Sequence, residues 1–150
     1  MFFWFAGTAV ASVWFIFRDP LFNYRYLIIG AVLPDVVDGW FGHVGPLHSV
    51  VTSVLLLIVA MLASIGSRPR RKRLLAGVIG VFMHLVFDGA FLNTRVFWWP
   101  IGGLGLSNVS LPSVSRGWWN VVLEIVGVLL CIWTRRRVRV TVSQPISGVL

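Results

Sequence analysis

The chain has 150 residues, of which 57% are hydrophobic and only 12% are charged, and its mean hydropathy is +0.86. Ordinary soluble domains carry roughly a quarter charged residues, so this composition predicts a membrane protein and leaves no room for a separate soluble domain. The net charge of +8 lies in short basic clusters beside apolar segments, which favours topology control and contact with anionic headgroups, and no nucleic-acid binding is expected.

Four apolar segments of the sequence are long enough to be interpreted as membrane spans. They run from Met1 to Phe17, Val50 to Ile65, Leu74 to Leu92 and Trp118 to Trp133. A shorter apolar segment, Tyr26 to Leu33, ends at Pro34 and is interpreted as a re-entrant helix, with a true crossing of residues 18–34 left open. The predicted fold is all-α, a polytopic membrane helix bundle of about four spans plus a short re-entrant helix, in which Ser49 caps the second span.

Two basic clusters orient this predicted bundle. One lies between Arg68 and Arg73 and the other between Arg135 and Arg139, and the positive-inside rule places both on the cytoplasmic side. The sequence therefore predicts a multi-pass protein of the plasma (inner) membrane, with a transmembrane domain over residues 1–134 and a basic cytoplasmic tail over residues 135–150. The segment before Val50 falls on the extracytoplasmic side.

Ionisable residues gather in two motifs. The stretch GAVLPDVVDGWFGHVGPLHS, from Gly30 to Ser49, holds two of the five acidic residues and two of the three histidines. The third histidine, His84, stands four residues before Asp88, so both side chains share one helical face. Unpartnered charged groups cost about 2.5 to 3.5 kcal/mol inside a span, so intramembrane polar residues are functional candidates by default.

Neutral imidazoles and carboxylates together are typical ligands of a divalent ion, here zinc, with manganese and iron as alternatives. The candidate metal ligands are Asp35, Asp38, His43, His48, His84 and Asp88. Six ligands suit two ions, or one ion with carboxylates that orient the imidazoles. Each residue alone also has a structural interpretation, such as a packed histidine or a helix cap. Glu124 is a further candidate, as a ligand, a general base or a partner of Arg116 or Asn120.

The motifs LPDVVD, HVGPLHS, GVFMHLVFD and FWWP, between about Gly30 and Pro100, resemble those of the YdjM family of predicted membrane-bound metal-dependent hydrolases. That family is remotely similar to the zinc-dependent phospholipase C and P1 nuclease group. The resemblance implies that the same six Asp and His residues bind metal. The chain departs from the family pattern at Val44 and Leu47, where the family has Arg and Thr.

Together these features predict a membrane-embedded metal-dependent hydrolase that cleaves a phosphoester of a lipid or lipid-linked substrate at the extracytoplasmic leaflet. Catalytic roles are expected for Asp35, Asp38, His48, Asp88 and Glu124, and which carboxylate acts as the general base is left open. The alternative is a metal-binding transport or regulatory membrane protein without hydrolytic activity. The inner halves of the predicted spans lack ionisable residues, which favours the enzyme over a transporter.

Overall fold

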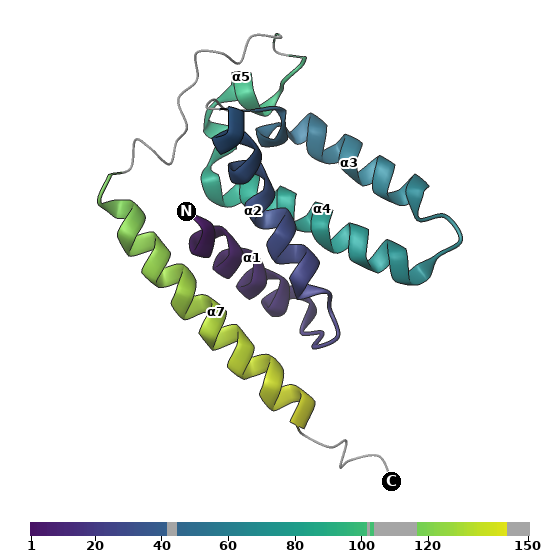
Figure 1. Cartoon of the computed structure of the whole chain (residues 1–150), viewed down its shortest axis with the longest axis vertical. Helices are drawn as coiled ribbons and strands as arrows, with labels where there is room; N and C mark the ends of the chain where they lie inside the picture. Colours follow the sequence, from purple (N-terminus) through teal and green to yellow (C-terminus); the bar gives the residue numbers. More distant parts are fainter. Residues whose placement is uncertain (42–44, 102, 104–116, 144–150) are drawn as a thin grey trace.

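The computed structural model describes residues 1–41, 45–101, 103 and 117–143, and the secondary structure of these residues is helical (Figure 1). The α-helices are α1 (Phe2–Phe17), α2 (Tyr24–Phe41), α3 (Val50–Ala63), α4 (Arg68–Asp88), α5 (Thr94–Phe97) and α7 (Trp119–Ser143), and two 3-10 turns, η1 (Pro46–His48) and η2 (Ala90–Leu92), join them. Ser49 caps α3 as expected, since its side chain accepts a hydrogen bond from the backbone of Val51.

Within the described residues, no helix combines the length and the apolar character that crossing a membrane requires. Helices α1 and α3 have 16 and 14 residues, short of the roughly 20 that a span needs. Helices α4 and α7 are longer, but each includes one of the basic clusters. The prediction of a polytopic membrane bundle with four spans is therefore wrong, and so is the plasma-membrane, multi-pass location with an extracytoplasmic site.

Helix α2 also differs from the expected short re-entrant segment. It runs for 18 residues and continues through Pro34, where the sequence predicts its end. A proline inside a helix costs about 3 kcal/mol because it removes a backbone hydrogen bond. Pro34 is fully buried, so its packing against the rest of the bundle offsets this cost. As a result Asp35 and Asp38 are both helical residues and lie about one turn apart.

The basic clusters are helical as well. Residues Arg68 to Arg73 form the first turns of α4. Helix α7 continues past Arg135 without interruption and ends at Ser143. The predicted boundary between residues 134 and 135 therefore falls inside one continuous helix.

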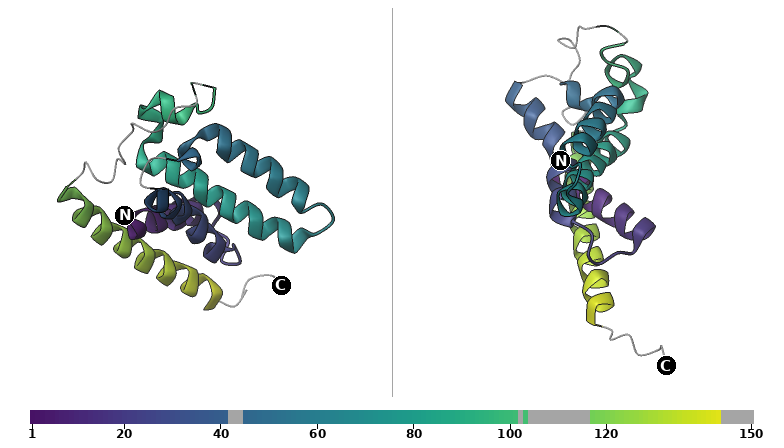
Figure 2. Two further views of the ribbon diagram at one scale, coloured as in Figure 1. Left: turned by 45° about the horizontal axis from the view of Figure 1, so that its top comes forward. Right: turned by 90° about the vertical axis from the view of Figure 1, so that its right-hand side faces the viewer.

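The helices pack in pairs, with α1 beside α7 and α2 beside α4, while α3 returns along α4 (Figures 1 and 2). Both close pairs depend on glycine. A Cβ atom on Gly80 would overlap the carbonyl oxygen of Leu27, and one on Gly7 would overlap the backbone of Gly127. Between α1 and α2 lies an apolar core of Phe5, Ala9, Val10, Val13, Leu27 and Ala31. Partly buried side chains of α4, among them Met83 and Phe87, pack against this core, so it holds α1, α2 and α4 together.

Candidate metal centre

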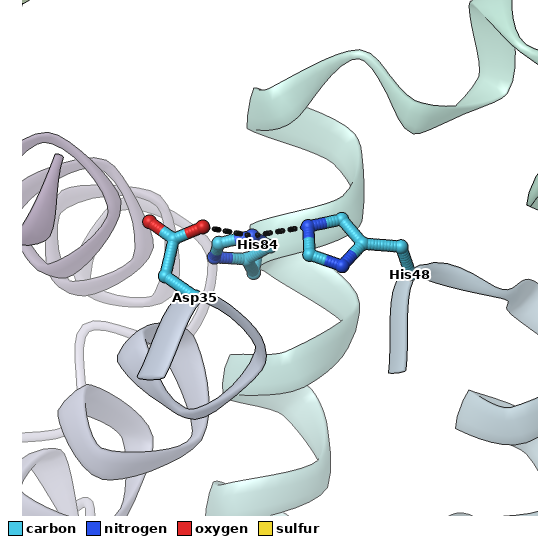
Figure 3. A group of neighbouring side chains, drawn as sticks. All are labelled: Asp35, His48 and His84. Atoms are coloured by element: carbon cyan, nitrogen blue, oxygen red, sulfur yellow. Dashed lines mark hydrogen bonds and ion pairs between the residues drawn. The ribbon is translucent and has the colours of Figure 1, made fainter. Parts of the chain in front are cut away.

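Three separate elements bring polar side chains to one point in the bundle. Helix α2 carries Asp35, η1 carries His48, and α4 carries His84 (Figure 3). The two imidazoles are buried, and the side chain of Asp35 is 13% exposed. The three side chains point toward one another, as the sequence predicts for members of one site.

The distances in this group fit a metal ion. Nε2 of His84 lies 3.1 Å from Nε2 of His48 and 3.6 Å from Oδ1 of Asp35. One ligand atom from each of the three residues lies within 4.8 Å of the others. A tetrahedral zinc ion with bonds of about 2.0 to 2.2 Å keeps its ligand atoms roughly 3.3 to 3.6 Å apart. Asp35, His48 and His84 could therefore hold a metal ion.

In each imidazole, the contact made by Nδ1 indicates which of the two ring nitrogens carries the proton. Nδ1 of His84 lies 2.7 Å from the carbonyl oxygen of Ala31, and because a carbonyl only accepts, Nδ1 is the donor. Nδ1 of His48 lies 2.8 Å from Oδ2 of Asp38, and the negative carboxylate favours a proton on that nitrogen. In neutral rings both Nε2 atoms then carry lone pairs that face each other. A cation between the rings, either a proton or a metal ion, relieves the repulsion between these lone pairs.

Asp38 lies behind His48. Its side chain is fully buried, and Oδ2 also accepts a 2.7 Å hydrogen bond from the backbone of Gly45. The carboxylate thus fixes the orientation of the His48 ring and the chain segment that leads into η1. Although the sequence names Asp38 as a candidate ligand, the structure places it beside Nδ1 of His48, on the side of the ring away from His84, in a carboxylate–histidine arrangement that is common around zinc.

Asp88 supplies a second carboxylate close to the two imidazoles. It is 5% exposed, and its Oδ2 lies 3.8 Å from Nε2 of His48. The side chain is one helical turn beyond His84 on α4, as their spacing of four residues requires. Asp88 would therefore be near enough to act as a further ligand of an ion held by this group, or to accept a proton from a nearby water.

Two other predicted site residues differ in their placement. His43 lies outside the described residues. Glu124 projects from α7, where Oε2 accepts a 2.9 Å hydrogen bond from the backbone of Phe3 and Oε1 lies 3.4 Å from the amino group of Met1. That amino group also lies 3.9 Å from Oδ2 of Asp35. Glu124 is thus joined to the group through the start of α1.

Burial and charge set the protonation of the centre in the absence of an ion. Burial, together with the charge of His48, lowers the pKa of His84 to about 3, so this ring is neutral. Burial alone would lower the pKa of His48, but the hydrogen bond and the negative charge of Asp38 outweigh it and raise the pKa. Burial also raises the pKa of Asp35. Of the two imidazoles, His48 is therefore the one that takes up a second proton more readily.

Two groups that contact His84 could not be identified from the sequence. The ring of Phe5 lies against His84, with ring centroids 3.9 Å apart, and the acceptor for His84 is a backbone carbonyl, that of Ala31. Phe5 sits in an apolar run like many others, and any residue at position 31 would offer a carbonyl. Only the packing of α1 and α2 against α4 identifies them.

Comparisons of this chain with protein-family models, with characterised proteins and with solved structures find no match. The similarity to the YdjM family stays a prediction that depends on the motifs alone. Any function must therefore be inferred from the geometry of the centre.

Proposed function

We propose that this protein is a metal-dependent hydrolase of phosphoesters, with its ion held by Asp35, His48 and His84. The observation that carries the proposal is the 3.1 Å approach of two Nε2 atoms in rings whose Nδ1 atoms each lie against an oxygen acceptor, Ala31 for His84 and Asp38 for His48. Three protein ligands with a further position for water are typical of catalytic zinc sites, whereas structural sites close all four positions with protein.

Phosphoester hydrolysis is the reaction that best suits this set of residues. When bound, a divalent ion lowers the pKa of its water and polarises the phosphoryl oxygen. His48 and His84 are held by Asp38 and Ala31, so neither ring has to reorient during turnover. The motif resemblance supports the same reaction class.

Asp88 is the residue that we assign as general base. Its carboxylate lies beside the imidazoles but outside the group of three ligands. It accepts a proton from the attacking water while the water oxygen forms a bond to phosphorus, the ester P–O bond breaks, and the leaving oxygen takes up a proton. Asp35 is the most exposed of the three ligands, so the substrate approaches over its carboxylate.

A lipid or lipid-linked phosphate is the first substrate class to test. The hydroxyl of Ser49, next to His48, donates to the carbonyl oxygens of Phe97 and Trp99. These bonds hold the segment that carries Trp98, whose side chain is 50% exposed, beside the centre. Exposed aromatic surface next to a phosphate-cleaving site suits a substrate with an apolar portion.

Elemental analysis combined with turnover tests the proposal. The purified protein is loaded with zinc, manganese or iron, and hydrolysis is measured on an aryl phosphate, a phosphodiester, a phospholipid and a prenyl phosphate. We expect bound metal near one ion per chain and turnover of at least one substrate. His84→Ala should lose both, whereas Asp88→Asn should keep the metal and lose about 100-fold or more in kcat.

Two results would reject the hydrolase. One is metal content and turnover that persist in His84→Ala. The other is stoichiometric metal without turnover of any substrate class, which would leave a metal-binding role without hydrolysis. Circular dichroism of each variant establishes that a loss of activity does not come from unfolding.

A further inference from the structure

A groove lies away from the metal centre, between the end of α1 and the C-terminal half of α7, and has a volume of about 470 Å³. It is lined mainly by Trp14, Phe15 and Arg18 from α1 and its cap and by Trp133, Arg137 and Val140 from α7. Helix α1 has 16 residues, so its two ends are roughly 24 Å apart. Because the metal centre is at the first of these ends, the groove is a separate site.

The groove has a strong positive charge. Arg18 and Arg137 are exposed, and neither guanidinium lies within 4.0 Å of a carboxylate among the residues that the structure describes. The exposed arginines Arg135, Arg136 and Arg139 on α7 add to the positive potential. Two guanidiniums without a carboxylate partner among the described residues, one at the cap of α1 and one on α7, favour an anion with several acceptor oxygens.

The walls of the groove are aromatic. The guanidinium of Arg137 stacks over the ring of Trp133, 5.5 Å from its centroid, so the cation is held at the edge of an apolar surface. Trp133 is 43% exposed and Phe15 is 72% exposed. A bare inorganic anion would use the arginines and leave these rings in water.

We propose that this groove binds an organic phosphate, with the phosphate between Arg18 and Arg137 and the apolar body against Trp133 and Phe15. Guanidinium groups match phosphate oxygens in a bidentate geometry, and the doubly charged phosphate balances two arginines. Pockets with apolar walls and a few convergent polar groups are typical small-molecule sites. The site is independent of the proposed hydrolase activity.

Calorimetry with phosphonates tests the proposal, because phosphonates resemble phosphate monoesters and are not hydrolysed. Phenylphosphonate and hexylphosphonate present a ring and a chain, methylphosphonate presents the charge alone, and phenol presents the ring alone. We expect the first or second to bind at least about tenfold more tightly than methylphosphonate and phenol. Tighter binding of phenylphosphonate would indicate that the apolar part of the natural ligand is flat, and tighter binding of hexylphosphonate would indicate that it is flexible.

Matched variants locate the binding. Arg18→Gln and Arg137→Gln should each weaken binding about tenfold or more, and Trp133→Leu should weaken phenylphosphonate but not methylphosphonate. Arg139→Gln removes the same charge from α7 outside the groove lining and should change the Kd by less than about twofold. Far-UV circular dichroism checks that each variant is folded.

Three outcomes would overturn the proposal. If Arg139→Gln weakened phosphonate binding as much as Arg18→Gln and Arg137→Gln do, the binding would come from diffuse positive charge and not from the groove. Equal affinity for methylphosphonate and the larger ligands would remove the role of the aromatic walls. Loss of phosphonate binding in His84→Ala would show that the phosphonate binds at the metal centre and not in the groove.

Discussion

A 2.7 Å hydrogen bond joins Nδ1 of His84 on α4 to the carbonyl oxygen of Ala31 on α2. The bond requires the two helix backbones to approach closely, and they do so where Gly80 lies against the carbonyl of Leu27 and Gly30 lies against Gly77. The crossing of α2 and α4 therefore directly orients one of the two imidazoles of the candidate metal centre.

Gly80→Ala tests this relationship. The added methyl would overlap the carbonyl oxygen of Leu27, so α2 and α4 must separate, and we expect the free energy of unfolding to fall by about 1 to 3 kcal/mol. Metal affinity should fall with it because His84 loses its acceptor. Gly39→Ala in α2 is the control, since nothing lies within 4 Å of its added Cβ, and it should raise stability by about 0.5 to 1 kcal/mol. Denaturant titration measures both, and equal stability of the two variants would contradict the helix-crossing account.

Asp38→Asn separates a ligand from a residue that orients a ligand. The amide keeps the size of the side chain and can still accept from Gly45, but it loses the charge that holds His48. We expect the metal Kd to rise about 10- to 100-fold with binding still measurable. Asp19→Asn, at an exposed carboxylate in the turn after α1, should leave the Kd unchanged. Complete loss of metal binding in Asp38→Asn would instead make Asp38 a direct ligand, as the sequence predicts.

Metal affinity should depend on pH with a defined sign. The raised pKa of His48 means that its Nε2 holds a proton at pH values where an ordinary histidine is neutral. An ion must displace that proton, so affinity should rise with pH by about tenfold per unit and level off above the raised pKa. His84, with a pKa of about 3, is already neutral above pH 5 and adds no slope there. Kd values measured between pH 5 and 9 check this, and a flat profile would mean that no proton is displaced.

Metal should also stabilise the fold. Free zinc at 100 times its Kd contributes about 2.7 kcal/mol, which corresponds to a Tm increase of about 5 to 10 °C for a chain of this size. The increase should disappear in His84→Ala, because that variant lacks a ligand. Thermal unfolding with and without metal measures the shift. An equal shift in His84→Ala would place the stabilising ion elsewhere in the protein.

Glu124→Gln examines a residue to which the sequence assigns several roles. Its carboxylate contacts Phe3 and the amino group of Met1, and it is 30% exposed. We expect unchanged metal content and kcat, with a loss of less than about 1 kcal/mol in stability because the interaction is partly solvated. A large fall in kcat at full metal occupancy would instead make Glu124 a base in the reaction.

Local geometry explains what could be predicted without a structure. The four-residue spacing of His84 and Asp88 places both on one face of any helix, and Ser49 before an apolar run predicts a helix start. The grouping of His48 with His84 and Asp35 also follows from the clustering of rare ionisable residues in two motifs. These patterns depend on few residues and little on distant packing.

Long-range packing decided the rest. Composition gives the number of apolar residues, but it does not give the length of each helix or the face that each helix buries. Some of these apolar residues are exposed: Trp40 is 87% exposed and Leu92 is 82% exposed. Pro34 ends a helix in isolation but lies inside α2 because burial offsets the lost hydrogen bond. By contrast, the sequence by itself determined that imidazoles and carboxylates would meet in one group, because they are rare in this chain and are concentrated in two motifs. Only the tertiary structure decided which nitrogen of each ring faces the centre of the group. Nδ1 of His48 lies against Asp38 and Nδ1 of His84 lies against Ala31, which leaves Nε2 of each ring to face the other residues of the group.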